Sequence, residues 1–257
     1  MRHAYQTALV TGASRGLGES LARRLADDGS NLVLLARRAE PLEVLASTLR
    51  SAHQVSVEVL TADLATPAGL AAAEARLTDP DRPIELLVNN AGSGSPGAFA
   101  DRPASSAEDQ IRLNVTAVVR LTHAALPAML SRAHGGVLNV SSVAGFFPSP
   151  GAVAYGASKA FVTSFSEGLA AELRGSGVHV TALCPGFTRT GLRGASVSGP
   201  AGLAWLDADK VAGAGLEAVA AGRVLSVPGA QYKSVVSLTR VVPRAVLRSA
   251  ATAMRRT

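Results

Sequence analysis

The chain has 257 residues, enough for one large domain with a sizeable buried core. Hydrophobic residues make up 47% of it and charged residues only 17%, a balance that excludes an intrinsically disordered chain. The formal net charge of +6 is unevenly placed, because seven basic and no acidic residues follow Glu217, so that the first 217 residues hold 18 basic and 19 acidic side chains. This near-neutral main part argues against a nucleic-acid partner.

The single cysteine, Cys184, permits no internal disulfide and fits a reducing compartment. No apolar segment of the signal-peptide type precedes the first predicted strand. No uninterrupted apolar run approaches about 18 residues. We therefore expect a cytoplasmic protein without a membrane span, and we expect no metal site.

The first predicted elements are a strand, a glycine-rich turn and a helix. An apolar run at residues 7–10 leads into TGASRGLG, and leucines then recur every four residues from Leu17, as on a helix packed against a sheet. Gly12, Gly16 and Gly18 permit a tight turn and close approach of the backbone to a ligand. Because free N–H groups at a helix start bind pyrophosphate, this segment predicts a dinucleotide site rather than a turn without a ligand.

Residues 31–38, NLVLLARR, predict a second strand that is buried on both faces. In NAD-binding folds, an acidic residue about 20 positions past the glycines binds the ribose 2′-hydroxyl. This chain has Ala36, Arg37 and Arg38 at that place, and Arg15 lies in the glycine turn. Arginine side chains suit a 2′-phosphate, so we expect NADP(H) as the cofactor, with Arg38 the most readily solvated of the three arginines.

Strands and helices continue to alternate along the chain, which predicts an α/β fold. We expect a Rossmann-type doubly wound parallel sheet of about seven strands with helices on both faces. A single catalytic domain over residues 1–229 would include a substrate loop at 187–207, and residues 230–257 would form a basic helical extension. The further predicted elements are strands at 55–60 and 84–88, a helix at 67–77, a loop at 93–103, one long helix at 105–131 that Pro127 kinks or ends, a strand ending at Ser142, a helix at 155–174, a strand within HVTALCPG and a last strand at 223–227.

Tyr155 and Lys159 are four positions apart and therefore share one face of the predicted helix. An ammonium group beside a phenol favours the phenolate and lowers its pKa from about 10. The phenol could then act as a general acid or base. A buried tyrosine and a solvated lysine show the same spacing, so the pair needs the support of the other motifs.

Four motifs in order resemble the short-chain dehydrogenase/reductase family, in its single-domain, NADP(H)-preferring and ketoacyl-reductase-like form. The first is TGASRGLG at 11–18 and the second is NNAG at 89–92. Ser142, followed by Tyr155 and Lys159, is the third, and a Pro-Gly turn at 185–186 is the fourth. The resemblance runs from residue 7 to residue 227, nearly the whole chain.

The resemblance implies a role for each motif residue. Tyr155 would be the general acid/base that protonates the carbonyl oxygen during reduction, and Lys159 would lower its pKa and hold the nicotinamide ribose. Ser142 would polarise the carbonyl, and Asn114 would hold a water that links Lys159 to solvent. The implied catalytic residues are Asn114, Ser142, Tyr155 and Lys159. The implied cofactor-binding residues are Gly12, Ser14, Arg15, Gly16, Leu17, Gly18, Arg37, Arg38, Asp63, Leu64, Asn90, Ala91, Gly92, Tyr155, Lys159, Pro185, Gly186, Thr188 and Thr190.

The implied function is hydride transfer between NADP(H) and a carbonyl or secondary alcohol. Our specific expectation is ketone reduction, with a 3-oxoacyl group as one option, because Phe146 and Phe147 and an apolar substrate loop predict an apolar pocket. The phenylalanine pair equally suits core packing. The alternatives are a small polyol, steroid or aromatic alcohol as substrate, or a non-catalytic NADP(H)-binding regulator, which would not need the four catalytic residues together. The family often forms dimers or tetramers, so we expect a homo-oligomer.

The last residues predict two helices separated by Pro243. Residues 231–242 would form the first helix. In the second, Arg244, Arg248 and Arg255 would project from one side, opposite an apolar side. Such a helix would bind an anionic membrane surface or an acidic acyl carrier, making the protein peripheral to the membrane. The alternative is an ordinary surface helix packed on its own domain or on a partner subunit. The apolar side would be formed by Val246, Leu247, Ala250 and Met254.

Overall fold

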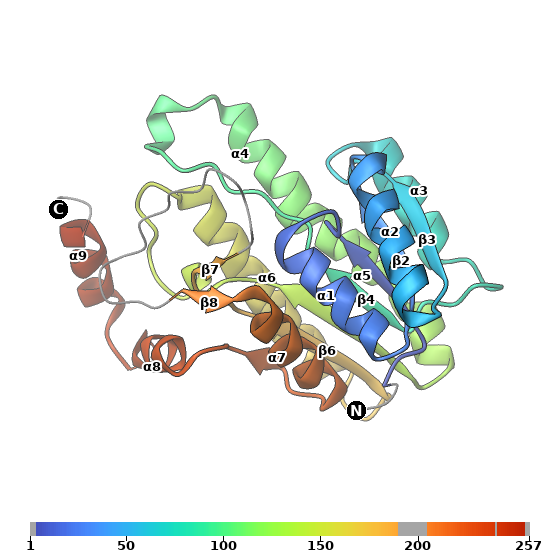
Figure 1. The fold of residues 1–257 in the computed structure, drawn as a ribbon. Coiled ribbons are helices and arrows are strands. Elements are labelled where there is room, and N and C mark those ends of the chain that lie inside the picture. The colour runs from blue at the N-terminus through green and yellow to red at the C-terminus, as the bar shows by residue number, and fades with distance from the viewer. Residues whose placement is uncertain (1–3, 190–204, 240, 255–257) are drawn as a thin grey trace.

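The computed structural model describes residues 4–189, 205–239 and 241–254. Its main sheet has seven parallel strands in the order β3-β2-β1-β4-β5-β6-β9 (Figure 1). This confirms the predicted doubly wound α/β fold. The inner strands are buried along almost their whole length, as expected for a sheet covered on both faces, whereas the edge strands β3 and β9 are only partly buried. The strands are β1 (Thr7–Thr11), β2 (Asn31–Ala36), β3 (Val57–Thr61), β4 (Leu86–Asn89), β5 (Gly135–Val140), β6 (Val178–Leu183) and β9 (Leu225–Ser226).

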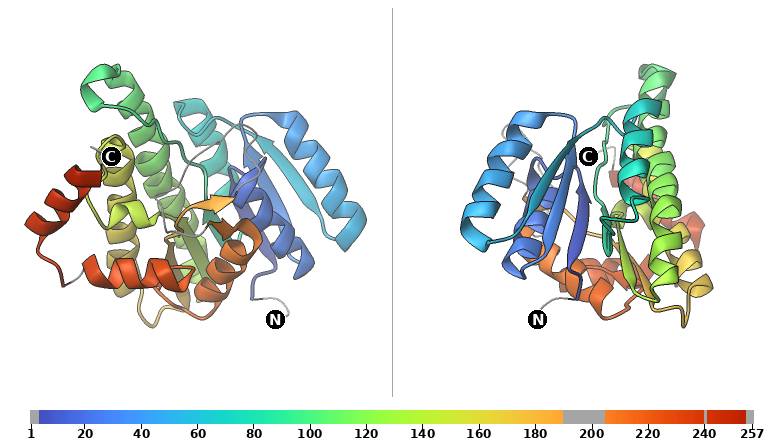
Figure 2. Two further views of the ribbon diagram at one scale, coloured as in Figure 1. Left: turned by 60° about the vertical axis from the view of Figure 1, so that its left-hand side comes forward. Right: turned by 90° about the vertical axis from the view of Figure 1, so that its right-hand side faces the viewer.

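Two helical layers cover the sheet (Figure 2). Because side chains alternate along a strand, Ala8 and Val10 of β1 pack with α1, α2 and α7, whereas Leu9 packs with α3 and α5 on the other face. Each layer buries its own apolar cluster, so the sheet lies between two cores. The helices of these layers are α1 (Gly16–Asp27), α2 (Ala39–His53), α3 (Pro67–Leu77), α4 (Ala104–Ile111), α5 (Ala117–Ser131), α6 (Val153–Glu172) and α7 (Ala208–Ala220).

The long helix predicted at 105–131 is interrupted. A π-helical turn, Arg112–Thr116, separates α4 from α5. Such a turn adds a residue between hydrogen-bonded positions without breaking the overall helical pattern, so apolar spacing did not reveal it. Pro127 lies inside α5, which continues to Ser131.

The helical stretch Ala104–Ser131 is long and apolar enough to cross a membrane, judged by length and composition alone. In this fold the same stretch lies against the sheet, with Leu121, Ala125 and Met129 buried in the apolar cluster beside α3. A core helix of a doubly wound fold has these properties.

The last part of the chain contains two helices, as predicted, α8 (Ala230–Thr239) and α9 (Arg244–Met254). Tyr232 and Val236 of α8 are buried in a third apolar cluster with Val143 and Cys184. A two-stranded ladder, β7 (Thr188–Arg189) with β8 (Leu206–Asp207), closes the stem of the predicted substrate loop. Most of that loop lies outside the described residues, as do Thr190 and Arg255.

Candidate active site

A cavity of about 580 Å³ opens at the carboxyl ends of the strands. It spans the point between β1 and β4 where the order of successive strands reverses, which is where doubly wound folds bind ligands. Every predicted cofactor-binding residue within the described ranges lines this cavity. The predicted residue Thr190 falls outside those ranges.

The glycine turn between β1 and α1 forms one wall of the cavity. Its backbone conformation requires residues without a side chain. Gly12 and Gly16 have positive φ angles of +66° and +62°, which residues with a Cβ rarely adopt. A Cβ on Gly18 would lie 2.3 Å from the carbonyl oxygen of Gly12, so the first turn of α1 can approach the strand end only with glycine there. The N–H groups that begin α1 are thereby brought to the cavity.

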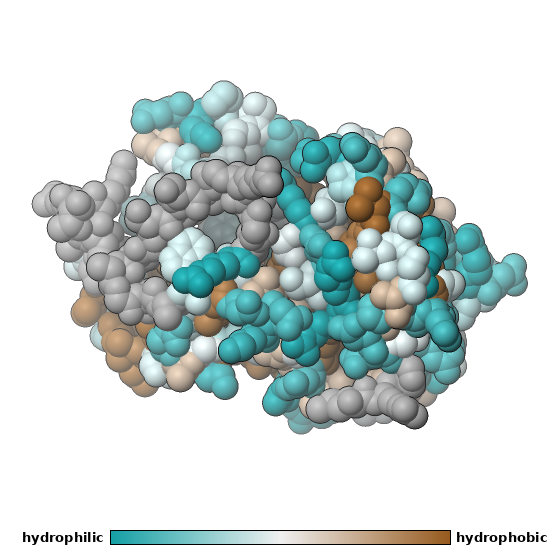
Figure 3. Space-filling model, viewed as in Figure 1, coloured by the Kyte–Doolittle hydropathy of each residue, from teal (hydrophilic) through white to brown (hydrophobic). Residues whose placement is uncertain are grey.

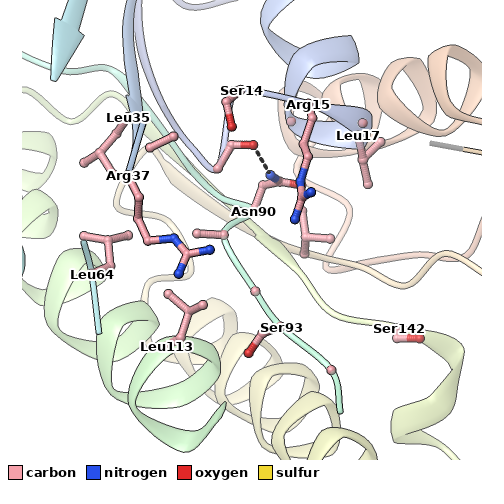
Figure 4. Close-up of a pocket in the computed structure, with 18 of the residues that line it drawn as sticks. Ser14, Arg15, Leu17, Leu35, Arg37, Leu64, Asn90, Ser93, Leu113 and Ser142 are labelled. Atoms are coloured by element: carbon pink, nitrogen blue, oxygen red, sulfur yellow. Dashed lines mark hydrogen bonds between the residues drawn. The ribbon is translucent and has the colours of Figure 1, made fainter. Parts of the chain in front are cut away.

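Thr11 and Asn90 fasten this turn to the end of β4. The Asn90 side-chain amide donates hydrogen bonds to the carbonyl oxygens of Thr11 and Gly12, at 2.9 and 3.3 Å (Figure 4). In return, the Thr11 hydroxyl accepts the backbone N–H groups of Asn90 and Ala91, both at 2.9 Å. Asn90 therefore holds the two loops of the cavity together as well as lining it.

The charged lining at the glycine end is mainly cationic. The guanidinium groups of Arg15, which precedes α1, and Arg37, which follows β2, extend toward the cavity (Figure 4). Arg38 also lines it, whereas Asp63 is the only carboxylate among its lining residues in the described chain. The Asp63 carboxylate accepts the N–H of Ala65 and so shapes its own turn. This distribution of charge suits an anionic ligand with several phosphates.

Ser142, Tyr155 and Lys159 meet at the other end of the cavity. Ser142 follows β5 and caps a short 3₁₀ turn, where its hydroxyl accepts the N–H of Ala144 at 3.2 Å. Tyr155 and Lys159 lie one turn apart on α6, with the Lys159 Nζ 5.7 Å from the centre of the Tyr155 ring. The Lys159 ammonium donates to the carbonyl oxygen of Val140 at 2.7 Å, which fixes it beside the end of β5.

Burial governs the protonation of this pair. It lowers the pKa of Lys159 from 10.5 to about 8, since a buried ammonium loses its hydration. Burial also raises the pKa of the Tyr155 phenol, and a hydrogen bond with Ser142 acts in the opposite direction. The pKa of the Tyr155 phenol therefore lies above its usual value, opposite to the predicted direction, because desolvation of the phenol is the largest effect.

Asn114 lies in the π-helical turn and is fully buried behind this end of the cavity. Its carbonyl oxygen accepts the N–H of Ser93 at 2.9 Å, and its amide donates to the carbonyl of Ser93 and the hydroxyl of Ser158 at 2.8 and 3.1 Å. A Cβ on Gly92 would lie 3.2 Å from Asn114 Oδ1 and 3.5 Å from Lys159 Nζ, so only a glycine separates the two groups.

Sequence reasoning missed several residues of the site. Gly94 faces Tyr155, since a Cβ there would be 3.3 Å from the tyrosine ring. Leu113 and Ser93 line the cavity as well. Gly94 lies in a segment read only as a loop rich in glycine, proline and serine. Its position two residues after NNAG was a usable signal, whereas contacts such as Thr11 with Asn90 join segments far apart in the chain. Phe146 and Phe147, for which both core packing and pocket lining were expected, are partly buried and pack against the third apolar cluster, and neither lines this cavity.

Comparison with known proteins agrees with this geometry. A family model described as short chain dehydrogenase matches residues 6–200. The chain is 40% identical over 187 residues to the oxidoreductase UcpA of Escherichia coli strain K12, covering 72% of this chain and 70% of that protein. Among solved structures, a short-chain dehydrogenase from Sphingobium yanoikuyae in complex with NADPH superimposes with a TM-score of 0.82 at 38% identity, over 93% of this chain and 97% of that one.

A second solved structure is the bulky-bulky ketone specific alcohol dehydrogenase from Comamonas testosteroni, with a TM-score of 0.81 at 36% identity over 93% of each chain. The family match covers well over half of this chain, and the matched segment includes the glycine turn, Ser142, Tyr155 and Lys159. This chain therefore belongs to the short-chain dehydrogenase family and is an oxidoreductase that acts on alcohols or ketones.

Proposed function

We propose that the protein transfers a hydride between NADP(H) and a ketone or secondary alcohol, with Tyr155 as the general acid and base. One observation carries this proposal: Ser142, Tyr155 and Lys159 converge at one end of a cavity whose other end combines a glycine turn with arginines. A cofactor that extends from the arginines to Tyr155 would contact both ends of the cavity.

The residues at the glycine end fit NADP(H). The N–H groups that begin α1 would hold the pyrophosphate, and glycine at positions 12 and 18 lets the turn pack closely enough against Asn90 at the end of β4 to bring these groups to the cavity. Arg15 and Arg37 would hold the 2′-phosphate, and no carboxylate stands where NAD-binding folds bind the free ribose hydroxyl. The NADPH complex of the Sphingobium relative supports this choice. When bound, the nicotinamide supplies the hydride in reduction and accepts it in oxidation.

The residues at the other end would manage the proton. During reduction, the Tyr155 phenol donates its proton to the carbonyl oxygen, and burial keeps the phenol protonated until that step by raising its pKa. The Ser142 hydroxyl holds the same oxygen and stabilises the charge that develops on it. The Lys159 ammonium, 5.7 Å from the ring, favours the phenolate that remains. Asn114 would connect Lys159 to solvent through a water, which would resupply the proton.

For the substrate, we propose a ketone with apolar substituents, a class that includes 3-oxoacyl groups. The Phe187 and Trp205 rings lie 5.5 Å apart at the stem of the substrate loop, next to Thr188 of the cavity wall. The bulky-ketone specificity of the Comamonas relative agrees with this class. A panel of ketones that differ in bulk and polarity would separate it from polyols and other alcohols.

The test measures NADPH oxidation with that panel for the wild type and Tyr155→Phe. We expect the variant to lose about 10²- to 10⁴-fold in turnover while still binding NADPH, because it lacks only the proton donor. Tyr5→Phe is a matched control, since Tyr5 is buried far from the cavity and its hydroxyl donates to the Val219 carbonyl. Turnover by Tyr155→Phe equal to that of the wild type would contradict the assignment of Tyr155 as the general acid and base. NADPH binding without turnover of any alcohol or ketone would support the regulator instead.

We also propose two kinds of partner. A homo-oligomer could form through α6, where Phe161 and Val153 are exposed and Phe161 stacks on Phe165. The end of the chain could bind an anionic membrane surface, because Leu238, Val241 and Val246 are exposed there and basic residues lie in the same segment. Figure 3 shows apolar side chains gathered at the lower left, in the region of α8. Size-exclusion chromatography with light scattering tests the oligomer, and a monomer at micromolar concentration would contradict it.

A further inference from the structure

The first turn of α8 lies directly behind the wall of the cavity. Its Tyr232 is 1% exposed and belongs to the apolar cluster that contains Val143 and Cys184. A Cβ placed on Gly186 would be 2.1 Å from Cζ of Tyr232. The tyrosine ring therefore occupies the space that any side chain at position 186 would need, and ring and backbone are in direct contact.

The hydroxyl of Tyr232 also holds the next residue. It accepts the backbone N–H of Phe187 at 3.1 Å. The carbonyl of Phe187 accepts the N–H of Leu206 at 2.7 Å, so both backbone groups of Phe187 are fixed. One is held by α8 and the other by the far side of the substrate-loop stem.

The segment that Tyr232 holds connects the cavity to the catalytic serine. Pro185, Gly186 and Thr188 all line the cavity. The Pro185 carbonyl accepts the N–H of Val143 at 3.1 Å and the Ser142 hydroxyl at 3.5 Å. A shift of the 185–188 turn would therefore reach both the cavity wall and Ser142.

We propose that Tyr232 is a positioning residue that sets this turn through its hydroxyl, which makes α8 a working part of the site. The inference rests on the proposed function, because the turn would shape the nicotinamide end of the NADP(H) site and the entry to the substrate loop. If Tyr232 served only as core packing, its ring alone would matter and its hydroxyl would not.

Tyr232→Phe separates these two roles, since it keeps the ring and removes the hydroxyl. Tyr5→Phe is the matched control: Tyr5 is also buried, also packs on a glycine, Gly136, and its hydroxyl also bonds to the backbone, but near the amino end of β5. Loss of a buried hydrogen bond of this kind changes an equilibrium by about 5-fold.

We expect both variants to lower the melting temperature by a similar amount. Only Tyr232→Phe should weaken NADPH binding and raise the KM for the ketone, each by about 3- to 10-fold, while the pH profile of kcat stays unchanged. Hydrogen exchange of the Phe187 amide should also quicken in Tyr232→Phe and stay unchanged in Tyr5→Phe.

An unchanged exchange rate at Phe187, or a Kd and KM within about twofold of the wild type, would overturn the inference. Failure of the proposed function gives a different result. In that case the wild type itself does not bind NADPH or reduce a ketone, whereas the exchange of the Phe187 amide still responds to the loss of the Tyr232 hydroxyl.

Discussion

At the scale of single residues, the site places a desolvated cation beside a desolvated phenol. Lys159 is 5% exposed and faces the Val140 carbonyl, and Tyr155 shares its face of α6. Neither group gains a carboxylate partner in the described part of the site. Their protonation states are therefore set mainly by burial, and this has a measurable effect on stability.

Lys159→Met tests that effect. The folded pKa of Lys159 is about 8 against 10.5 for the free side chain, so between these pH values the unfolded chain holds a proton that the folded chain has released. Since the unfolded state binds more protons there, the free energy of unfolding rises with pH, by about 3 kcal/mol across the window. Below pH 8 this gain is absent.

We expect the wild type to gain that amount relative to Lys159→Met in urea unfolding at several pH values from 8 to 10.5. Lys210→Met, at an exposed lysine of α7, should run parallel to the wild type. Parallel curves for Lys159→Met would mean that the lysine is not desolvated.

Arg37→Asp tests the phosphate end of the cavity. Removing the guanidinium should weaken NADPH binding by about 10- to 100-fold, because a charge-assisted contact is lost, and the new carboxylate could accept the ribose hydroxyl of NADH. Titration with both cofactors measures the ratio. Arg23→Asp makes the same charge change at an exposed arginine of α1 that pairs with Glu19. A preference that is unchanged in Arg37→Asp would refute the phosphate pocket.

At the scale of elements, the sequence predicted whether a segment is a helix or a strand better than it predicted where helices are interrupted. The helix at 67–77 has the predicted bounds, and both C-terminal helices are present. The π-helical turn that carries Asn114 was not predicted, since one added residue leaves the apolar pattern intact. Helix α2 was also missed, although Leu42, Leu45 and Leu49 carry a helical spacing.

The candidate site likewise has a part that the sequence predicted and a part that it did not. Motif residues could be placed from their spacing, because each follows a strand and parallel strands end at one edge of the sheet. Contacts such as Tyr232 with Phe187 could not, since 45 positions separate the two residues and only the fold brings them together. The pKa direction of Tyr155 also required the degree of burial, which the spacing of Tyr155 and Lys159 does not contain.

Alanine substitutions at two helix glycines, Gly18 and Gly168, test whether the glycine turn between β1 and α1 is closely packed. In Gly18→Ala, the added methyl group would lie 2.3 Å from a backbone oxygen, so the turn must shift, and we expect a loss of about 1–3 kcal/mol in stability together with NADPH affinity. Gly168 lies in α6 with nothing within 4 Å of an added Cβ, so Gly168→Ala should stabilise the protein by about 0.5–1 kcal/mol. Thermal unfolding and NADPH titration measure both, and equal effects of the two substitutions would contradict the close-packed turn.

At the scale of the whole molecule, the candidate active site and the excess of positive charge lie in different parts of the chain. The cavity lies at the switch point between β1 and β4, whereas all residues after Glu217 are basic or uncharged. In that last part, Val241 is 77% exposed and Val246 is 55% exposed, and Arg244 is exposed between them in the chain. These exposed apolar and basic side chains are the basis of the membrane proposal, since an anionic lipid surface could bind both kinds.

Deletion of residues 244–257 tests this surface on the whole protein. The deleted segment holds four arginines, Arg244, Arg248, Arg255 and Arg256, and each basic residue near an anionic bilayer contributes about 1 kcal/mol. We therefore expect the full chain to sediment with phosphatidylserine vesicles at low salt and the deletion variant to remain in solution, with NADPH binding intact in both. Raising the salt should release the full chain, because screening removes the ionic part of the attraction.

Val241→Ser with Val246→Ser keeps every charge and should weaken binding at all salt concentrations, which separates the apolar contribution from the ionic one. If the full chain ignores these vesicles at low salt but binds an acidic carrier protein, the basic residues serve a protein partner and the membrane proposal is wrong.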